Sequence, residues 1–213
     1  MVTATRHPRT PAGSQRARLD EGRVIEAAER VVDRDGWDGL TMTVLARELA
    51  IRTPSLYNHV DGLDAVRALL QRRVLTQLGT ELRDAALGRS REDGLRTLAH
   101  VYRDFARRHP GRYTALSRQM PEEATGEAEA HALEALAAIL RSFGLSDAEQ
   151  QDALVPLWST VHGFVTLELN GAFPPGTDAE AAYERTLDGV LRVVELFVES
   201  SRSNPPTPRR TRT

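Results

Sequence analysis

Apolar residues recur along this chain at the three- and four-residue spacing of amphipathic helices, and no stretch of any length alternates as a strand would. The first such segment follows Asp20 and carries Val24, Ala28 and Val31 on one stripe. Asp20 suits the N-cap of this helix, and Gly36 suits the position where it ends. We therefore expect a helix between these two residues and a fold made of helices throughout.

Two short helices are predicted next, in LTMTVLARELA and in TPSLYNHV. Thr41 suits the N-cap of the first and Thr53 that of the second. Pro54 would then be the first helical residue, where its missing N–H costs nothing. Ala50 stands where a helix end favours glycine, at a cost of about 1 kcal/mol.

The rest of the chain is also predicted to be helical. Asp61 and Gly62 interrupt the pattern, and Pro, Gly and Asp turn signals separate the segments that follow. The expected helices cover about 63–87, 91–108, 111–119, 124–143, 146–171 and 179–200.

The two short helices fit a helix-turn-helix. Leu45, Leu49, Ile51 and Leu56 would face inward, and the small Ala46 would let the two helices cross closely. The side chains left facing outward are Arg52, Thr53, Ser55, Tyr57, Asn58 and His59. Such side chains can hydrogen-bond base edges and phosphates in a major groove. The spacing alone also fits a helical hairpin in an ordinary bundle.

Composition excludes several classes of protein. A chain of 213 residues with 40% hydrophobic and 27% charged residues can bury a sizeable core. It has no cysteine, so it forms no disulfide and no cysteine-based metal site. No apolar run approaches the roughly 20 residues of a membrane span, and the N-terminal segment lacks the apolar region of a signal peptide. We therefore expect a cytoplasmic protein.

The net charge of −2 conceals two basic ends. Residues 1–20 carry +3 and residues 201–213 carry +4, which leaves −9 on the segment between them. We expect both ends to be disordered. An acidic body is unlike that of a protein that binds nucleic acid without specificity. The arginines of the first end (Arg6, Arg9, Arg16 and Arg18) either enter a minor groove or only aid solubility.

The segment GWDGLTMTVLARELAIRTPSLYNHVDGLDAV resembles the DNA-binding domain of the tetracycline-repressor-like (TetR) family of bacterial regulators. The resemblance covers about Val24 to Leu70, and its motif is Gly39-Leu40-Thr41, Leu45-Ala46 and Leu56-Tyr57-x-His59. Further on, LWSTVHGFVTLELNGAF carries Trp158, His162 and Gly163, and it resembles the WHG-type C-terminal domain of the same family.

The resemblance implies an all-α homodimer that binds a palindromic double-stranded DNA operator and is released by a small-molecule effector, without cofactor or metal. It implies a helix-turn-helix domain over 20–66 and a ligand-binding and dimerisation domain over 67–200, between disordered ends at 1–19 and 201–213.

Carried onto this chain, the resemblance makes two groups of residues DNA-binding. Thr41, Met42 and Thr43 would open the second helix beside the DNA backbone. The recognition surface would comprise Arg52, Thr53, Pro54, Ser55, Tyr57, Asn58 and His59. We expect phosphate contacts from Tyr57 and His59, and base contacts from Arg52 and Asn58. The lysine that many members place near the start of the fourth helix is absent from Asp61-Gly62-Leu63-Asp64, which weakens that phosphate contact.

Helix 146–171 is apolar on two sides, so we expect it to be buried on two sides. One side would meet a partner subunit through Thr160, Gly163, Phe164, Leu167 and Gly171. Leu187, Val190 and Val194 of the last helix would join it in a four-helix dimer interface.

The other side carries Trp158 and His162, one turn apart, which we interpret as the wall of a mostly apolar ligand pocket. A lone histidine on an apolar face is also compatible with a satisfied core residue. Tyr102, Phe105 and Tyr113 either wall the same cavity or pack in the core.

No catalytic motif is present. Glu127, Glu129, His131 and Glu134 spread round a charged helix surface and lack a second histidine at metal-ligand spacing. The GxGxxG, P-loop, HExxH and GxSxG patterns do not occur. We interpret the chain as a ligand-responsive regulator, in the first place a repressor. A corepressor-dependent or constitutive regulator, and a helical small-molecule-binding protein or enzyme without DNA binding, are the alternatives.

Overall fold

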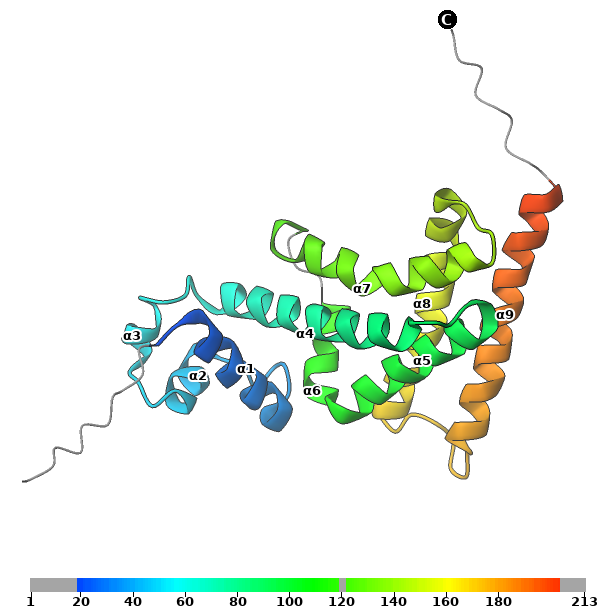
Figure 1. The fold of residues 1–213 in the computed structure, drawn as a ribbon. Coiled ribbons are helices and arrows are strands. Elements are labelled where there is room, and N and C mark those ends of the chain that lie inside the picture. The colour runs from blue at the N-terminus through cyan, green and yellow to red at the C-terminus, as the bar shows by residue number, and fades with distance from the viewer. Residues whose placement is uncertain (1–18, 119–121, 204–213) are drawn as a thin grey trace, which may run out of the picture.

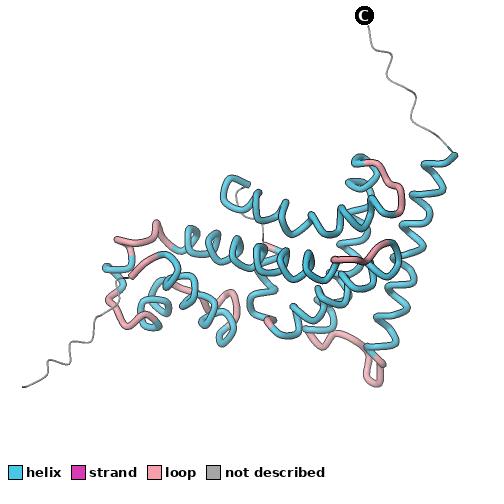
Figure 2. The backbone as a smooth tube through the Cα atoms, in the orientation of Figure 1, coloured by secondary structure: helices cyan, strands magenta, loops and turns pink. Residues whose placement is uncertain are grey.

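The computed structural model describes residues 19–118 and 122–203, and every regular element in these ranges is a helix (Figures 1 and 2). In chain order the helices are α1 (Glu21–Asp35), α2 (Met42–Glu48), α3 (Thr53–Leu56), α4 (Leu63–Ala86), α5 (Arg91–Arg108), α6 (Pro110–Tyr113), the 3-10 helix η1 (Thr114–Ser117), α7 (Glu122–Ser142), α8 (Asp147–Leu169) and α9 (Ala179–Ser203). The all-helical prediction is confirmed. The single helix expected over 111–119 was wrong, because α6 continues as a 3-10 helix.

The helices form an elongated molecule with α1, α2 and α3 at one end and α9 at the other (Figure 1). α4 runs from the first group into the body, where α7 lies along it. Gly79 lets these two helices approach closely, since a Cβ atom there would lie 2.9 Å from the Cα atom of Ala132. None of the helices in the described ranges has the length and apolarity that a membrane span requires.

The predicted caps explain where the first helices begin. The Asp20 side chain accepts a hydrogen bond from the Arg23 N–H at 2.9 Å, and Thr41 accepts one from the Val44 N–H at 3.2 Å. Ala50 has a φ of 54°, the left-handed conformation that disfavours a side chain, at the position where glycine was expected to be more comfortable. Thr53 is not an N-cap, because the helix begins with it and Arg52 takes the cap position without a side-chain bond.

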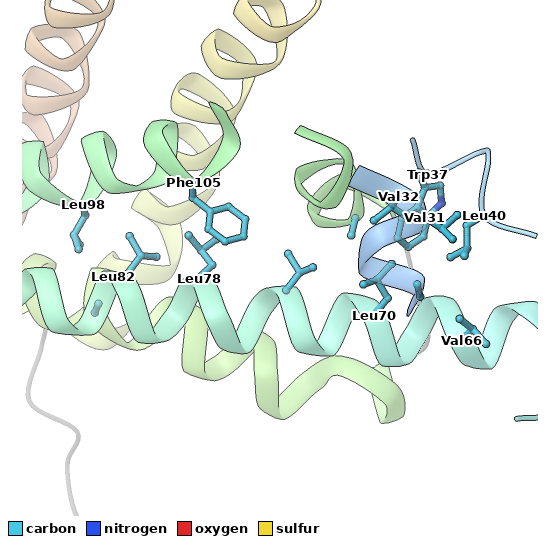
Figure 3. Close-up of a cluster of buried hydrophobic side chains, with 14 of the residues drawn as sticks. Val31, Val32, Trp37, Leu40, Val66, Leu70, Leu78, Leu82, Leu98 and Phe105 are labelled. Carbon is cyan, nitrogen blue, oxygen red and sulfur yellow. The ribbon is translucent and has the colours of Figure 1, made fainter. Parts of the chain in front are cut away.

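One continuous cluster of buried side chains extends from α1 to α9. Figure 3 shows how α4 joins its parts. Val66 and Leu70 lie toward the α1 end of the cluster, and Leu78 and Leu82 lie toward α5. A single rigid helix therefore contributes to the core beside the helix-turn-helix and to the core of the larger body.

Some residues assigned to the predicted disordered ends belong to the described structure. Leu19 packs against the core, so it does not belong to a disordered arm. At the other end, α9 continues to Ser203, beyond the start of the predicted tail. The arginines Arg6, Arg9, Arg16 and Arg18 lie outside the described residues.

Candidate functional site

The helix-turn-helix is built on buried anchors beneath an exposed polar surface. Leu45 and Ala46 of α2 and Leu56 of α3 are buried in the shared core. The turn between the helices is closed by hydrogen bonds from the Ile51 N–H to the Ala46 carbonyl and from the Ala50 N–H to the Arg47 carbonyl, both 3.0 Å. The predicted packing of this corner is therefore present.

The surface over these anchors exposes most of the predicted recognition residues: Arg52, Pro54, Ser55, Tyr57, Asn58 and His59. Thr53 is half-buried. The Tyr57 side chain is 55% exposed. Since α3 ends at Leu56, Asn58 and His59 lie on the turn that follows, where the His59 N–H bonds the Leu56 carbonyl at 2.9 Å.

Met42 was wrongly predicted to lie beside DNA. Its side chain is buried in the core, since the first residue of α2 faces inward. Thr41 and Thr43 on either side of it are exposed. The three residues could be separated only once it was known which of them begins the helix.

Two arginines of α1 hold α2 in place. Arg30 Nε lies 2.8 Å from one Glu48 carboxylate oxygen, and Arg34 Nη1 lies 3.0 Å from the other. These hydrogen bonds lower the pKa of Glu48, and the bond from Arg30 has the largest effect. The pairs are exposed, so they orient the helices more than they stabilise the fold.

The body contains a cavity of about 390 Å³, within the range of small-molecule sites. It lies among α4, α5, η1, α7, α8 and α9, and it is lined by Gln71, Leu75, Leu78, Leu82, Leu95, Leu98, Ala99, Tyr102, Leu116, Arg118, Glu129, Ala132, Leu133, Leu136, Leu154, Val155, Leu157, Trp158, Val161 and Val190. Leucine, valine and alanine dominate this wall. The Trp158 side chain is 42% exposed, so it also reaches solvent.

A polar cluster backs the cavity where α5 meets α8. His162 Nδ1 lies 2.8 Å from the hydroxyl of Tyr102 and 2.8 Å from that of Tyr113. Trp158 stacks on the His162 ring with centroids 4.8 Å apart. Burial lowers the pKa of His162 and raises that of Tyr102 well above its usual value. The cluster is therefore neutral at pH 7 and holds both hydrogen-bond donors and acceptors.

These contacts divide the five residues predicted for the ligand pocket. Tyr102 and Trp158 line the cavity. His162 and Tyr113 contact those two residues and support them. Of the two alternatives left open for Phe105, the structure has core packing, because this side chain is fully buried and is not part of the cavity wall. The leucines of α4 were missed, although Leu75, Leu78 and Leu82 follow helical spacing on one face.

α8 presents small and apolar side chains on a face that is open to solvent in the subunit. Thr160 and Leu167 are exposed, Leu167 by 49%. A Cβ atom added to Gly163 would meet no atom within 4 Å, and the same holds at Gly189 on α9. Val193 and Leu196 follow Gly189 by four and seven residues, so the three lie on one face of α9.

The other residues predicted for the dimer interface have partners inside the subunit. Leu187, Val190 and Val194 are buried in its own core, so their side chains cannot form the contact surface. Phe164 packs on Phe173 and Tyr183. Gly171 follows the end of α8 at a φ of 62°, and it serves the turn rather than a helix contact.

A buried ion pair fixes α5 against α8 and α9. The Arg103 guanidinium is almost fully buried, and its Nη2 lies 2.6 Å from a carboxylate oxygen of Glu168. Its Nη1 lies 2.8 Å from Glu180. The hydrogen bonds from Arg103 lower the pKa of Glu168. The ion pairs therefore hold α8 and α9, whose outward faces carry Gly163 and Gly189, in fixed positions on α5.

Comparisons with known proteins agree with this geometry. Residues 95–190 match the family model for the tetracyclin repressor-like C-terminal domain. The HTH-type transcriptional regulator Rv0681 of Mycobacterium tuberculosis is 38% identical over 182 residues, which cover 83% of this chain and 81% of the relative. The HTH-type regulator YobS of Bacillus subtilis is 32% identical over 161 residues, covering 75% and 84%.

A solved structure shares the fold. The TetR family protein ActR of Streptomyces coelicolor, in complex with actinorhodin, superimposes with a TM-score of 0.68 at 20% identity. The superposition covers 84% of this chain and 96% of ActR.

Proposed function

Because the chain belongs to the tetracycline-repressor-like family of DNA-binding transcriptional regulators, we propose that it is a homodimeric repressor released from a palindromic operator by a small apolar effector. The relatives are regulators, so the enzyme alternative is set aside. The observation that carries the proposal is an exposed recognition surface joined by α4 to an apolar cavity. Operator binding assigns the protein to the cytoplasm, where the DNA lies.

We assign DNA binding to residues 20–66 and effector binding with dimerisation to residues 67–200. The core crosses this boundary along α4, because its buried residues meet both α1 and α5 (Figure 3). An effector that binds one position of α4 better than another would therefore change the placement of the helix-turn-helix. If the protein were a constitutive regulator, the cavity would have no function.

Operator binding tests this proposal directly. We expect the full-length protein to bind the DNA upstream of its own coding sequence in fluorescence anisotropy, with affinity that falls steeply as salt rises. Binding no tighter than that to shuffled DNA of equal length would contradict the proposal.

Two substitutions are expected to separate phosphate contact from base reading. Tyr57→Ala should weaken binding to every sequence, since a phosphate contact carries no base information. Asn58→Ala should relax preference at one base pair in each half-site, by about 1–3 kcal/mol. Both follow from the exposure of these side chains beside the buried Leu56. Anisotropy on wild-type and point-mutated operators measures both effects.

Leu87→Ala is the matched control, because this exposed side chain lies at the far end of α4 from α3. Its operator affinity should equal that of the wild type. Wild-type binding by both the Tyr57 and the Asn58 variants would remove these residues from the recognition surface.

The cavity supports an effector that is flat or largely apolar. Its walls are mostly aliphatic, and the neutral cluster of Tyr102, Tyr113 and His162 offers hydrogen bonds without charge. Such a site suits a hydrophobic ring system with few polar groups better than a sugar or nucleotide. ActR, which shares this fold, has been solved in complex with actinorhodin.

His162→Phe and Trp158→Ala should retain operator binding and lose effector-induced release. The first removes the nitrogen that meets two tyrosine hydroxyls, and the second removes a lining ring. Release is measured by titrating the operator complex with a ligand found by thermal-shift screening of aromatic compounds. If both variants give wild-type release curves, Trp158 and His162 are core residues and the effector site lies elsewhere.

A further inference from the structure

Gln71 of α4 is the one amide side chain in the cavity wall as the described residues form it. It is only 3% exposed. Its Nε2 lies 2.7 Å from the Ala115 carbonyl oxygen and 2.8 Å from that of Arg118. Both partners are acceptors, and only the NH₂ group of an amide can donate to them. The contacts therefore fix the orientation of the amide and direct its oxygen away from the η1 segment.

The Gln71 oxygen has no partner. It is buried, and it makes no hydrogen bond within residues 19–118 and 122–203. Protein interiors nearly always satisfy a buried amide oxygen, because an unpaired one loses its hydration without compensation. An acceptor left in this condition, on a residue that lines a ligand-sized cavity, is a candidate to bond with something that enters the cavity.

The side chains that flank Gln71 on the described wall are mostly aliphatic. Leu75 and Leu78 follow on the same face of α4, and Leu116 comes from η1. The two charged lining residues, Arg118 and Glu129, are exposed and remain hydrated. Gln71 is thus a buried polar side chain in an apolar part of the wall. It lies on a different helix from Tyr102 of α5 and Trp158 of α8.

We propose that Gln71 determines effector specificity by accepting, at its Oε1 atom, a hydrogen bond from a hydroxyl or N–H group of an otherwise apolar effector. The inference rests on the proposed function in one respect, because it takes the cavity as the effector site. The effector would then bond to α4 directly. Through the same amide, α4 is tied to the carbonyls of Ala115 and Arg118, so the effector also meets the joint between α4 and η1.

Two aromatic probes that differ by one proton donor test the proposal. 2-Naphthol carries a hydroxyl, and 2-methoxynaphthalene keeps the oxygen but lacks the proton. Calorimetry on the full-length protein without DNA should show that wild type prefers 2-naphthol by about 3- to 10-fold, the effect of one neutral hydrogen bond. Gln71→Met should bind both probes about equally, because it keeps the length of the side chain and removes the acceptor.

Three further variants separate this role from a structural one. Gln71→Glu keeps an acceptor, but its carboxyl group, buried against two carbonyl oxygens, is protonated and can donate to only one of them. It should therefore retain the preference for 2-naphthol while the link to η1 is weakened. Leu75→Met, one turn along α4, should change both affinities alike and keep their ratio. Tyr102→Phe should also keep the ratio. The ratio of the two affinities cancels a general loss of stability.

Several results would overturn the proposal: no binding of either probe to wild type, equal binding of both, a preference retained in Gln71→Met, or a preference lost in Gln71→Glu or Tyr102→Phe. Loss in Gln71→Glu would mean that the amide serves only to join α4 to η1. Loss in Tyr102→Phe would assign the hydroxyl to the other end of the cavity. The calorimetry contains no DNA, so its results do not depend on operator binding. A failure to bind operator would contradict the proposed function and would leave the probe affinities unchanged.

Discussion

Gly163→Leu is expected to abolish the dimer and operator binding while each subunit stays folded. A Cβ atom at Gly163 meets nothing within 4 Å in its own subunit, so the larger side chain has room to project outward. It would project from the stripe that also carries Thr160 and Leu167, where we propose that a partner helix packs closely. A leucine there adds about four heavy atoms between two helices that small residues hold together, and overpacking of this kind costs about 1–3 kcal/mol in each subunit. Twofold symmetry places the substitution twice in one interface.

Light scattering measures the assembly, circular dichroism the fold, and anisotropy the operator binding. Ala138→Leu is the matched control, since it adds a leucine to an exposed position of α7, a helix outside the proposed interface. It should remain dimeric. A Gly163→Leu protein that is still dimeric, or a wild type that is monomeric at micromolar concentration, would remove α8 from the interface.

Gly111→Ala is expected to force α6 away from α1 and to lower the free energy of unfolding by about 1–3 kcal/mol. A Cβ atom at Gly111 would lie 1.9 Å from the carbonyl oxygen of Val32 and 2.6 Å from its carbonyl carbon. These are backbone atoms of α1, so the collision cannot be relieved by a side-chain rotation. The same contact includes the Arg112 guanidinium, whose Nη2 lies 2.7 Å from a carboxylate oxygen of Asp33. Operator affinity should fall as well, since α1 supports α2.

The expected loss of stability is opposite in sign to the usual effect of replacing glycine by alanine in a helix. Glycine to alanine within a helix normally stabilises by up to about 1 kcal/mol. Gly22→Ala in α1 should follow that rule, because its Cβ atom would meet only an Asp20 carboxylate oxygen, at 3.5 Å. Thermal melting should therefore move Gly22→Ala up and Gly111→Ala down by roughly 2–10 °C. A Gly111→Ala protein as stable as the wild type would show that α1 and α6 separate freely.

The helix-turn-helix could be predicted from the sequence because its pattern is local. Leu45, Ala46 and Leu56 lie within a short stretch, and their burial follows from helical spacing and one turn. Relatives at 38% and 32% identity confirm the family to which that pattern pointed. Met42 was misassigned because the helix begins there, and a shift of one residue changes the side that faces inward.

The dimer residues were harder to predict because apolar side chains look the same in a core and in an interface. Leu187 and Val194 satisfy the spacing of a buried face, and the subunit itself buries them. Gly189 and Leu196, on the adjoining side of α9, have no such partner. Only the packing of α9 on the other helices decides between the two faces.

The cavity depends on contacts between residues far apart in the chain. Gln71, Tyr102 and Trp158 come from three helices, and no spacing in the sequence brings them together. His162 was found through its place beside Trp158, one turn away. Gln71 stood out only when its two carbonyl partners and its unpaired oxygen were seen in the fold.

We propose that a twofold-symmetric protein reads DNA through the surface around α3. This is tested by selecting binding sites from random double-stranded DNA with the full-length protein and sequencing the bound fraction. We expect an enriched palindrome whose half-sites lie about one helical turn, or a multiple of it, apart, and the loss of one preferred base pair per half-site with Asn58→Ala. Absence of any enriched sequence, or an enriched sequence without twofold symmetry, would contradict it.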